Sequence, residues 1–235
     1  MKPVLTFRDA FTDAAPIIVS GFMFGLVFGV LASKAGLTTF ATALMSLLVF
    51  AGASQFVAIE QWQPGHLPVV GIVLTTLLVN LRHLLMSLSL RRAFLRESRS
   101  RLLPSFALLL IDETWALAEH RFKQAQPSLR YFVQAGLLIY AGWVGGSVIG
   151  TLVGSRIPDP DAFGLDFTFI AMFLSLMVLL WRHLMDFGTW LLSGAIATAV
   201  MHLPGLGDAS VVIAAVVASA VVAALPLPQL SRGAA

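Results

Sequence analysis

The sequence contains no cysteine among its 235 residues. This absence excludes disulfide bonds, thiolate nucleophiles, iron–sulfur ligation and cysteine-based zinc sites. The five histidines are scattered, and the sequence has neither a His-Glu-x-x-His nor a Gly-x-Ser-x-Gly motif. We therefore expect no metal, no cofactor and no enzymatic activity.

Charged residues are also scarce. They make up 11% of the chain, against 58% hydrophobic residues, whereas a soluble domain carries roughly 25% charged residues. Fifteen Lys and Arg with twelve Asp and Glu cannot cover a water-exposed surface, so lipid must solvate much of this protein. No basic stretch has interleaved aromatic residues, which argues against a nucleic-acid partner. The composition predicts an all-α integral membrane protein.

Apolar runs divide the chain into seven or eight predicted transmembrane segments within one multi-span domain, residues 1–235. Most approach the roughly 20 residues that a bilayer crossing requires. The first continues too far for a cleavable signal and is expected to be retained. The segments are Ala14–Ser33, Thr38–Ile59, Leu67–Leu90, Leu102–Ala118, Tyr131–Gly154, Phe167–Trp181, Phe187–Met201 and Ser210–Leu225.

Two basic loops indicate the orientation but conflict with a simple topology. The Arg91–Arg101 loop carries five arginines, and Arg121–Arg130 carries three further basic residues. Both are expected in the cytoplasm, where lysine and arginine are enriched. A single crossing by Leu102–Ala118 would instead separate them. Either the charge bias is only statistical here, or some segments are broken or re-entrant, which is tolerated where backbone lines a cavity.

Two glycine stripes suggest an internal repeat. Glycines recur every four residues in two predicted segments, at Gly21, Gly25 and Gly29 and at Gly142, Gly146 and Gly150. Such spacing lines one helix face and allows close helix packing. Similar apolar runs follow both stripes, which favours repeat halves at about 14–90 and 131–201. Chance coincidence of two glycine-rich helices is the alternative.

Ionisable residues inside apolar segments are costly, and they mark candidate functional sites. Asp112 and Glu113 interrupt one such segment, and Arg82 and His83 interrupt another. Arg82 is the natural partner of one of the two acids, while the other could exchange a proton. A purely structural ion pair, or side chains that reach the lipid headgroups, would explain the same pattern.

A patch of small residues lies in the middle of the second segment. Gly52 and Ser54 precede Gln55 there. Small residues could unwind the helix and expose backbone groups to a substrate. Tight helix packing, with Gln55 as an interhelical hydrogen-bonding group, explains the patch equally well.

Three motifs together resemble the AzlC family, the large subunits of branched-chain amino acid exporters. They are the small-residue–Ser–Gln patch, the Asn-x-Arg-His motif at Asn80–His83, and the Asp-Glu-Thr motif at Asp112–Thr114. The resemblance covers about residues 7–200. It implies a multi-pass protein of the bacterial plasma (inner) membrane that exports leucine, isoleucine, valine and, in some members, methionine. It also implies proton-gradient drive and a small membrane partner of the AzlD type.

From these residues we hypothesise a mechanism. The charged ends of an amino acid would meet polar groups around Ser54, Gln55 and Asn80. Asp112 or Glu113 would exchange a proton, with Arg82 as its alternating partner, and His83 is a further coupling candidate. A channel, or a structural membrane subunit for another small solute, is the alternative function.

Overall fold

The computed structural model describes residues 3–62, 67–94, 103–157 and 184–202, with five single residues between 164 and 178. The secondary structure in this part of the chain is helical, as predicted. Two compact units are present, Met1–Phe169 and Ile170–Ala235. The candidate site lies entirely in the first unit.

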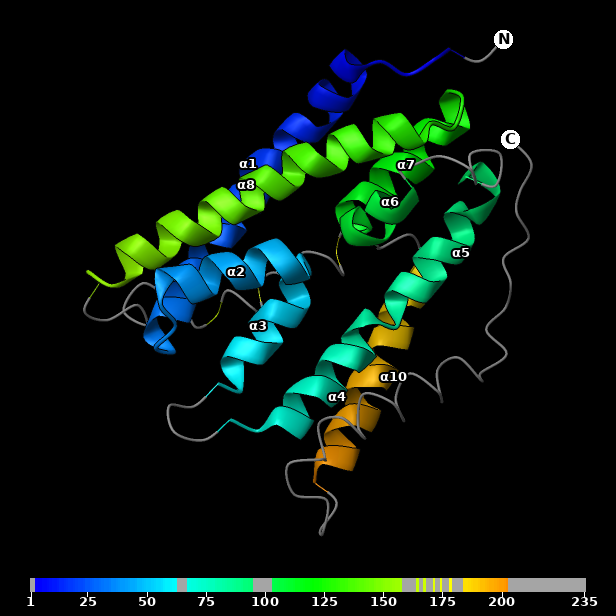
Figure 1. The fold of residues 1–235 in the computed structure, drawn as a ribbon. Coiled ribbons are helices and arrows are strands. Elements are labelled where there is room, and N and C mark those ends of the chain that lie inside the picture. The colour runs from blue at the N-terminus through cyan, green and yellow to red at the C-terminus, as the bar shows by residue number, and fades with distance from the viewer. Residues whose placement is uncertain are drawn as a thin grey trace. The chain divides into compact units, whose positions relative to one another are not determined.

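Two long helices, α1 (Phe7–Lys34) and α8 (Leu129–Gly154), lie side by side along their lengths (Figure 1). The side chain of Thr6 caps the first turn of α1, and Asp9 bonds back to the Thr6 backbone. Ser128 caps α8 in the same way. Both caps satisfy backbone N–H groups that would otherwise have no partner. Proline at position 16 lies inside α1.

The glycine stripes face each other in the contact between α1 and α8. A Cβ atom added at Gly29 or Gly150 would overlap the facing backbone. One added at Gly25 would lie 2.5 Å from the carbonyl oxygen of Trp143, and one at Gly142 would lie 3.1 Å from that of Ile18. The predicted packing role is thus present at these positions. Gly21 differs, because a Cβ there would meet only Ile139, at 3.9 Å.

The order of these contacts shows that α1 and α8 run parallel. Positions 18, 22, 26 and 30 of α1 lie opposite positions 142, 146, 150 and 154 of α8, respectively. Both helices therefore begin at one end of the pair, called here the amino end, and finish at the carboxyl end.

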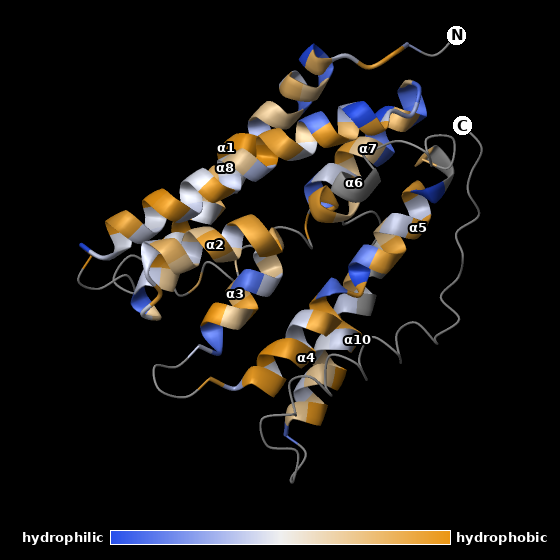
Figure 2. Ribbon diagram, in the orientation of Figure 1, coloured by the Kyte–Doolittle hydropathy of each residue, from blue (hydrophilic) through white to orange (hydrophobic). Residues whose placement is uncertain are grey.

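The third long helical segment consists of α4 (Val69–Asn80) and α5 (Arg82–Phe94), which are separated at Leu81. It runs opposite to α8, because Phe94, at the end of α5, meets Phe132 edge-on near the amino end, with ring centroids 5.7 Å apart. Figure 2 shows mostly hydrophobic colours on α4, with hydrophilic residues where α4 meets α5. None of the α4 residues is buried.

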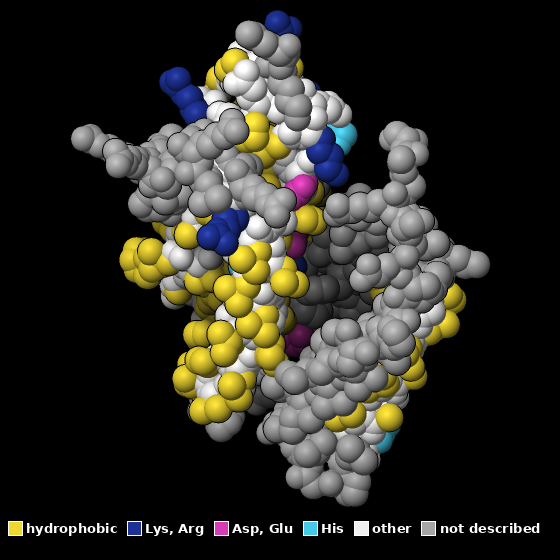
Figure 3. All heavy atoms as spheres, turned by 90° about the vertical axis from the view of Figure 1, so that its right-hand side faces the viewer, with side chains coloured by type: hydrophobic (Ala, Val, Ile, Leu, Met, Phe, Trp, Pro, Cys, Tyr) yellow, Lys and Arg dark blue, Asp and Glu magenta, His cyan; other side chains and the backbone are white. Residues whose placement is uncertain are grey.

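Three helical segments in the described part of the chain are long and apolar enough to cross a membrane. They are Phe7–Lys34, Val69–Arg91 and Leu129–Gly154. Large apolar side chains lie exposed on them, for example Val70 at 73% and Leu85 at 72% exposure. Figure 3 shows hydrophobic side chains gathered over a broad area of one face, with few charged groups among them. Lipid is the solvent that such surfaces require.

The segment Leu102–Ala118, predicted to cross the membrane, is not one continuous helix. It forms α6 (Leu103–Leu109) and α7 (Asp112–Gln124), which are broken at Leu110 and Ile111. Phe94 contacts Phe106 of α6 at 5.0 Å and Phe122 of α7 at 5.7 Å between ring centroids. Both ends of this helix pair therefore lie at the amino end. The pair thus returns to the end at which it begins, as the alternative of a broken or re-entrant segment predicts.

The predicted Thr38–Ile59 span is also broken. It forms α2 (Thr39–Val49) and α3 (Gly52–Glu60), and Phe50 between them has left-handed backbone, with φ of 37°. The α2 helix begins just beyond the carboxyl end of α1. Gln61 follows α3 and donates a 2.9 Å hydrogen bond to Thr75 in the second turn of α4. The α2–α3 pair thus enters and returns at the carboxyl end.

The second unit contains α10 (Leu184–Met201). Its apolar part, Trp190–Met201, is shorter than a bilayer crossing. The predicted segment Ser210–Leu225 and most of Phe167–Trp181 lie outside the described residues, as does most of the Arg91–Arg101 loop. The prediction of seven or eight spans is not confirmed, and the repeat stays a prediction.

The contact between α1 and α8 predicts that alanine destabilises the protein at one of two adjacent glycines and not at the other. Gly146→Ala should destabilise the purified protein by about 1–3 kcal/mol or more, because the new methyl group meets the backbone of Phe22 and the two helices must separate. Gly145→Ala is the matched control, since its nearest contact is the Phe22 ring at 4.0 Å. Thermal unfolding in detergent measures both. Equal melting temperatures would contradict the tight contact.

Candidate functional site

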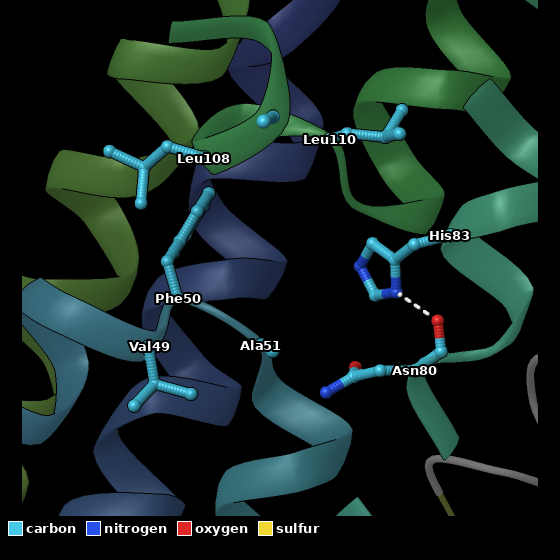
Figure 4. A pocket seen from close by; sticks show the side chains of 8 residues that line it. Val49, Phe50, Ala51, Asn80, His83, Leu108 and Leu110 are labelled. Atoms are coloured by element: carbon cyan, nitrogen blue, oxygen red, sulfur yellow. Dashed lines mark hydrogen bonds between the residues drawn. The ribbon is translucent and has the colours of Figure 1, made fainter. Parts of the chain in front are cut away.

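Three helix breaks meet at one cavity of about 280 Å³. The break between α2 and α3, the break between α4 and α5, and the break between α6 and α7 each contribute lining residues, as Figure 4 shows. The contacts on α8 give the depth of this region: Leu109 packs on Gly136, and Phe50 packs on Tyr140, midway along the helix. The lining residues are Val49, Phe50, Ala51, Asn80, His83, Ala107, Leu108 and Leu110.

The polar side of the cavity comes from the break between α4 and α5. Asn80 ends α4, and its side-chain oxygen accepts a 3.0 Å hydrogen bond from the hydroxyl of Ser54, which is buried. This bond leaves the amide nitrogen of Asn80 free to face the cavity, and Figure 4 shows it turned toward Ala51. The His83 ring lies above Asn80, and its Nδ1 is 3.1 Å from the Asn80 carbonyl oxygen.

The apolar side comes from the other two breaks. Phe50 is 4% exposed, and its ring meets that of Tyr140 edge-on at a centroid distance of 4.8 Å. The Tyr140 hydroxyl also donates a 2.8 Å hydrogen bond to the carbonyl of Leu47, near the end of α2. This bond satisfies one of the carbonyl groups that the end of a helix leaves unpaired. Tyr140 therefore holds the break to α8.

Two of the predicted substrate-binding residues face α8 instead of the cavity. Gln55 is fully buried; its amide nitrogen donates to Ser46 at 3.1 Å, and its oxygen accepts from Trp143 at 3.0 Å. A Cβ added at Gly52 would lie 2.7 Å from the Trp143 ring. Ser54 and Asn80 are brought together at the cavity, with Asn80 in its lining. Sequence reasoning missed Trp143, although it lies within the second glycine stripe.

The expected ion pair of Arg82 is present, and its partner is Asp112, at 2.6 Å. Each side chain is 29% exposed. The Nε atom of Arg82 is buried and has no hydrogen-bond partner among the described residues. Arg82 thus keeps donor capacity that Asp112 does not use.

Glu113, the second acid of the motif, is exposed. A second bond joins the same helices, since Trp115 donates to Ser89 at 2.7 Å.

A second ion pair, which the sequence analysis missed, holds the other end of α7. Arg121 donates two hydrogen bonds to the carboxylate of Asp13 in α1, and Tyr131 of α8 donates a third at 2.7 Å. These bonds from the guanidinium raise the pKa of Arg121 above its usual value, so it stays charged. Asp13 and Arg121 are 108 residues apart and both border predicted segments, so no local pattern marks them.

These features define an integral membrane protein with a solute-sized cavity where its helices break. The chain belongs to the AzlC protein family, which it matches over residues 16–157. This confirms the resemblance carried by the three motifs.

Its curated relatives are membrane proteins from bacteria and an archaeon. An uncharacterized membrane protein of Helicobacter pylori (strain ATCC 700392 / 26695) is 33% identical over 173 residues, 73% of this chain and 74% of that protein. An uncharacterized membrane protein of Archaeoglobus fulgidus is 30% identical over 213 residues, 89% of this chain and 90% of that protein. The branched-chain amino acid transport protein AzlC of Bacillus subtilis is 29% identical over 177 residues, 74% of this chain and 68% of that protein. No solved structure matches significantly.

The Arg82–Asp112 pair predicts a non-additive stability effect. Asp112→Asn should lower the free energy of unfolding by about 1–3 kcal/mol, because it leaves the charge of Arg82 unpaired. This loss lies between that for breaking a surface ion pair and that for breaking a buried one. Adding Arg82→Gln should restore most of that loss. Glu119→Gln, on the same helix, is the control. Denaturant unfolding in detergent measures each, and additive losses would contradict a coupled pair.

Proposed function

We propose that this chain is the large subunit of a secondary active exporter of branched-chain amino acids in the bacterial plasma membrane. Membership of the AzlC family supports this function, together with the name of the Bacillus subtilis relative. The observation in the structure that carries the proposal is the cavity where three helix breaks meet.

The cavity suits a small zwitterion with an apolar side chain. Its volume of about 280 Å³ has room for several water molecules at roughly 30 Å³ each, and so for a small solute. The apolar wall of Val49, Phe50, Leu108 and Leu110 offers contacts for the side chain. The free amide N–H groups of Asn80 offer donors for the carboxylate.

The helix breaks support transport over a static binding role. Discontinuous helices near the middle of the membrane form the binding sites of many secondary transporters. Here one re-entrant pair comes from each end of the α1–α8 pair, and both tips line the cavity. Movement of either tip would open the cavity toward its own end, which is what alternating access requires.

The amino end of the α1–α8 pair is proposed to face the cytoplasm. The basic residues that the structure describes on either side of the α6–α7 pair, Arg91 and Arg121, lie near this end, as does Arg8 in the first turn of α1. The enrichment of lysine and arginine on the cytoplasmic side then orients the protein.

The proton gradient is the proposed driving force, and a small membrane protein of the AzlD type is the proposed partner. His83 lines the cavity, and Asp112 and Glu113 follow the break at Ile111. These are groups that can take up a proton. A channel, or a structural subunit for another solute, is the second candidate function, because a cavity between helices is also compatible with passive flux.

Efflux from loaded cells tests the proposal. Cells carrying labelled leucine, valine, isoleucine or methionine should export label when this chain and its small partner are both present. A protonophore should abolish that export. Non-saturable flux that ignores the protonophore would favour a channel. No efflux, with protein confirmed in the membrane, would sink the proposed function.

Filling the cavity should block transport. Leu108→Trp is expected to lower leucine efflux by at least about tenfold, because one surplus methylene group in a pocket already costs about 1–3 kcal/mol. Leu137→Trp is the matched control, since Leu137 is similarly exposed (51% against 44%) and does not line the cavity. The amount of protein in the membrane is measured for both. Equal transport by the two variants would place the substrate elsewhere.

A further inference from the structure

The His83 ring presents one nitrogen to the cavity in a defined chemical state. Its Nδ1 lies 3.1 Å from the carbonyl oxygen of Asn80. A carbonyl oxygen can only accept a hydrogen bond, so Nδ1 carries the hydrogen of the neutral ring. Nε2 then has a lone pair and acts as the acceptor. This arrangement resembles the way a backbone carbonyl fixes the tautomer of histidine ligands.

We propose that Nε2 of His83 is the site at which the proton and the ammonium group of the amino acid compete. The proposal rests on the proposed function and adds how its two fluxes are coupled. Figure 4 shows Nε2 on the side of the ring that faces Phe50 and Ala51. It has no hydrogen-bond partner among the described residues. The lone pair is therefore available to either species.

The surrounding groups orient a zwitterion with its ammonium at His83. The amide N–H groups of Asn80 lie beside the ring and are donors, so they suit the carboxylate. The first turn of α3 follows Ala51 and has no side-chain cap, which adds backbone N–H groups of the same character. An ammonium group has donors only and needs an acceptor. Among the side chains that line the cavity, Nε2 supplies a free one.

Few charged groups surround this nitrogen. Helices α2, α4 and α6 carry no charged residue, and the one on α3, Glu60, lies at its far end. The charged groups beside the breaks are Arg82, Asp112 and Glu113, and the first two are paired with each other. His83 is the titratable residue among those lining the cavity.

The exchange balances with water as the proton carrier. On the side of higher proton concentration, a hydronium ion gives a proton to Nε2: an O–H bond breaks, an N–H bond forms, and water is left. The ring becomes a cation, which repels the ammonium group. The zwitterion leaves. On the other side the Nε2–H bond breaks, water takes the proton, and the lone pair accepts a hydrogen bond from the next ammonium group. One positive charge moves inward for each amino acid that moves outward.

The purified chain with its small partner tests this competition. Leucine binding is measured by calorimetry from pH 5 to pH 8, in buffers that also report proton release. Affinity should fall by about tenfold per pH unit below the midpoint, with close to one proton released per leucine bound there. Histidine is the side chain that ordinarily titrates between pH 5 and pH 8, so this range is the one to measure.

Single substitutions identify the residue that binds the competing proton. His83→Gln and His83→Asn keep a carbonyl acceptor that cannot be protonated in this range, so leucine affinity should vary by less than about twofold across the same pH range. His120→Gln is the control, because His120 is exposed on α7 and contacts Gln124. It should retain the pH dependence. Asp112→Asn and Glu113→Gln test whether a carboxylate carries the proton instead.

Several outcomes would overturn the proposal. One is pH-independent leucine binding by the unmodified protein, which leaves the proposed function standing. Another is pH dependence that survives in the His83 variants and disappears in a carboxylate variant, which moves the coupling to that carboxylate. If neither His83 variant folds, calorimetry of the unmodified protein is extended down to pH 4, and proton release confined to the range below pH 5, where carboxylates titrate, rejects the proposal. Absence of binding by leucine, isoleucine, valine and methionine would sink the proposed function as well.

Discussion

The close backbone contact between α1 and α8 supports everything else in the first unit. Without side chains on the facing glycines, the two helices approach until their backbones touch, which gives dispersion contacts along their whole length. Successive turns of α8 then hold the surrounding elements: Gly136 receives Leu109, Tyr140 holds the end of α2, and Trp143 bonds to Gln55. The wall of the cavity is thus attached to a helix whose backbone is in direct contact with that of α1.

The cavity follows from how a bilayer treats backbone. Each helix end leaves N–H and C=O groups unpaired, and lipid offers them no partner. Breaks within the membrane are therefore stable only where they face protein or a polar space. Because the three breaks lie at one place, a single polar cavity can solvate the unpaired backbone groups of all of them. The groups that this leaves available, an amide, an imidazole and the start of a helix, are those that a zwitterion needs.

Hydropathy and spacing predicted much of this, because they record which residues prefer lipid and which faces can approach closely. Three segments long and apolar enough to cross, the packing glycines and an ion pair of Arg82 with one of the two adjacent acids followed from them. Hydropathy has no direction, so it could not show that Leu102–Ala118 turns back. The return of this segment is visible only in contacts between distant residues: the Phe94 ring meets those of Phe106, Phe122 and Phe132. The Asp13–Arg121 pair escaped for a similar reason, as it joins charges at two segment boundaries.

The two ends of α7 are fastened to different helices, and the end held to α1 and α8 can act as a pivot. At Arg121 the helix is fastened by two hydrogen bonds to Asp13, which Tyr131 also binds. At its other end the helix is held by the ion pair of Asp112 with Arg82 and by the hydrogen bond from Trp115 to Ser89. A rod fastened at one end swings about that end, and α7, with 13 residues, is about 20 Å long. A tilt that hardly disturbs the contacts around Arg121 therefore displaces the tip beside the cavity by several ångströms.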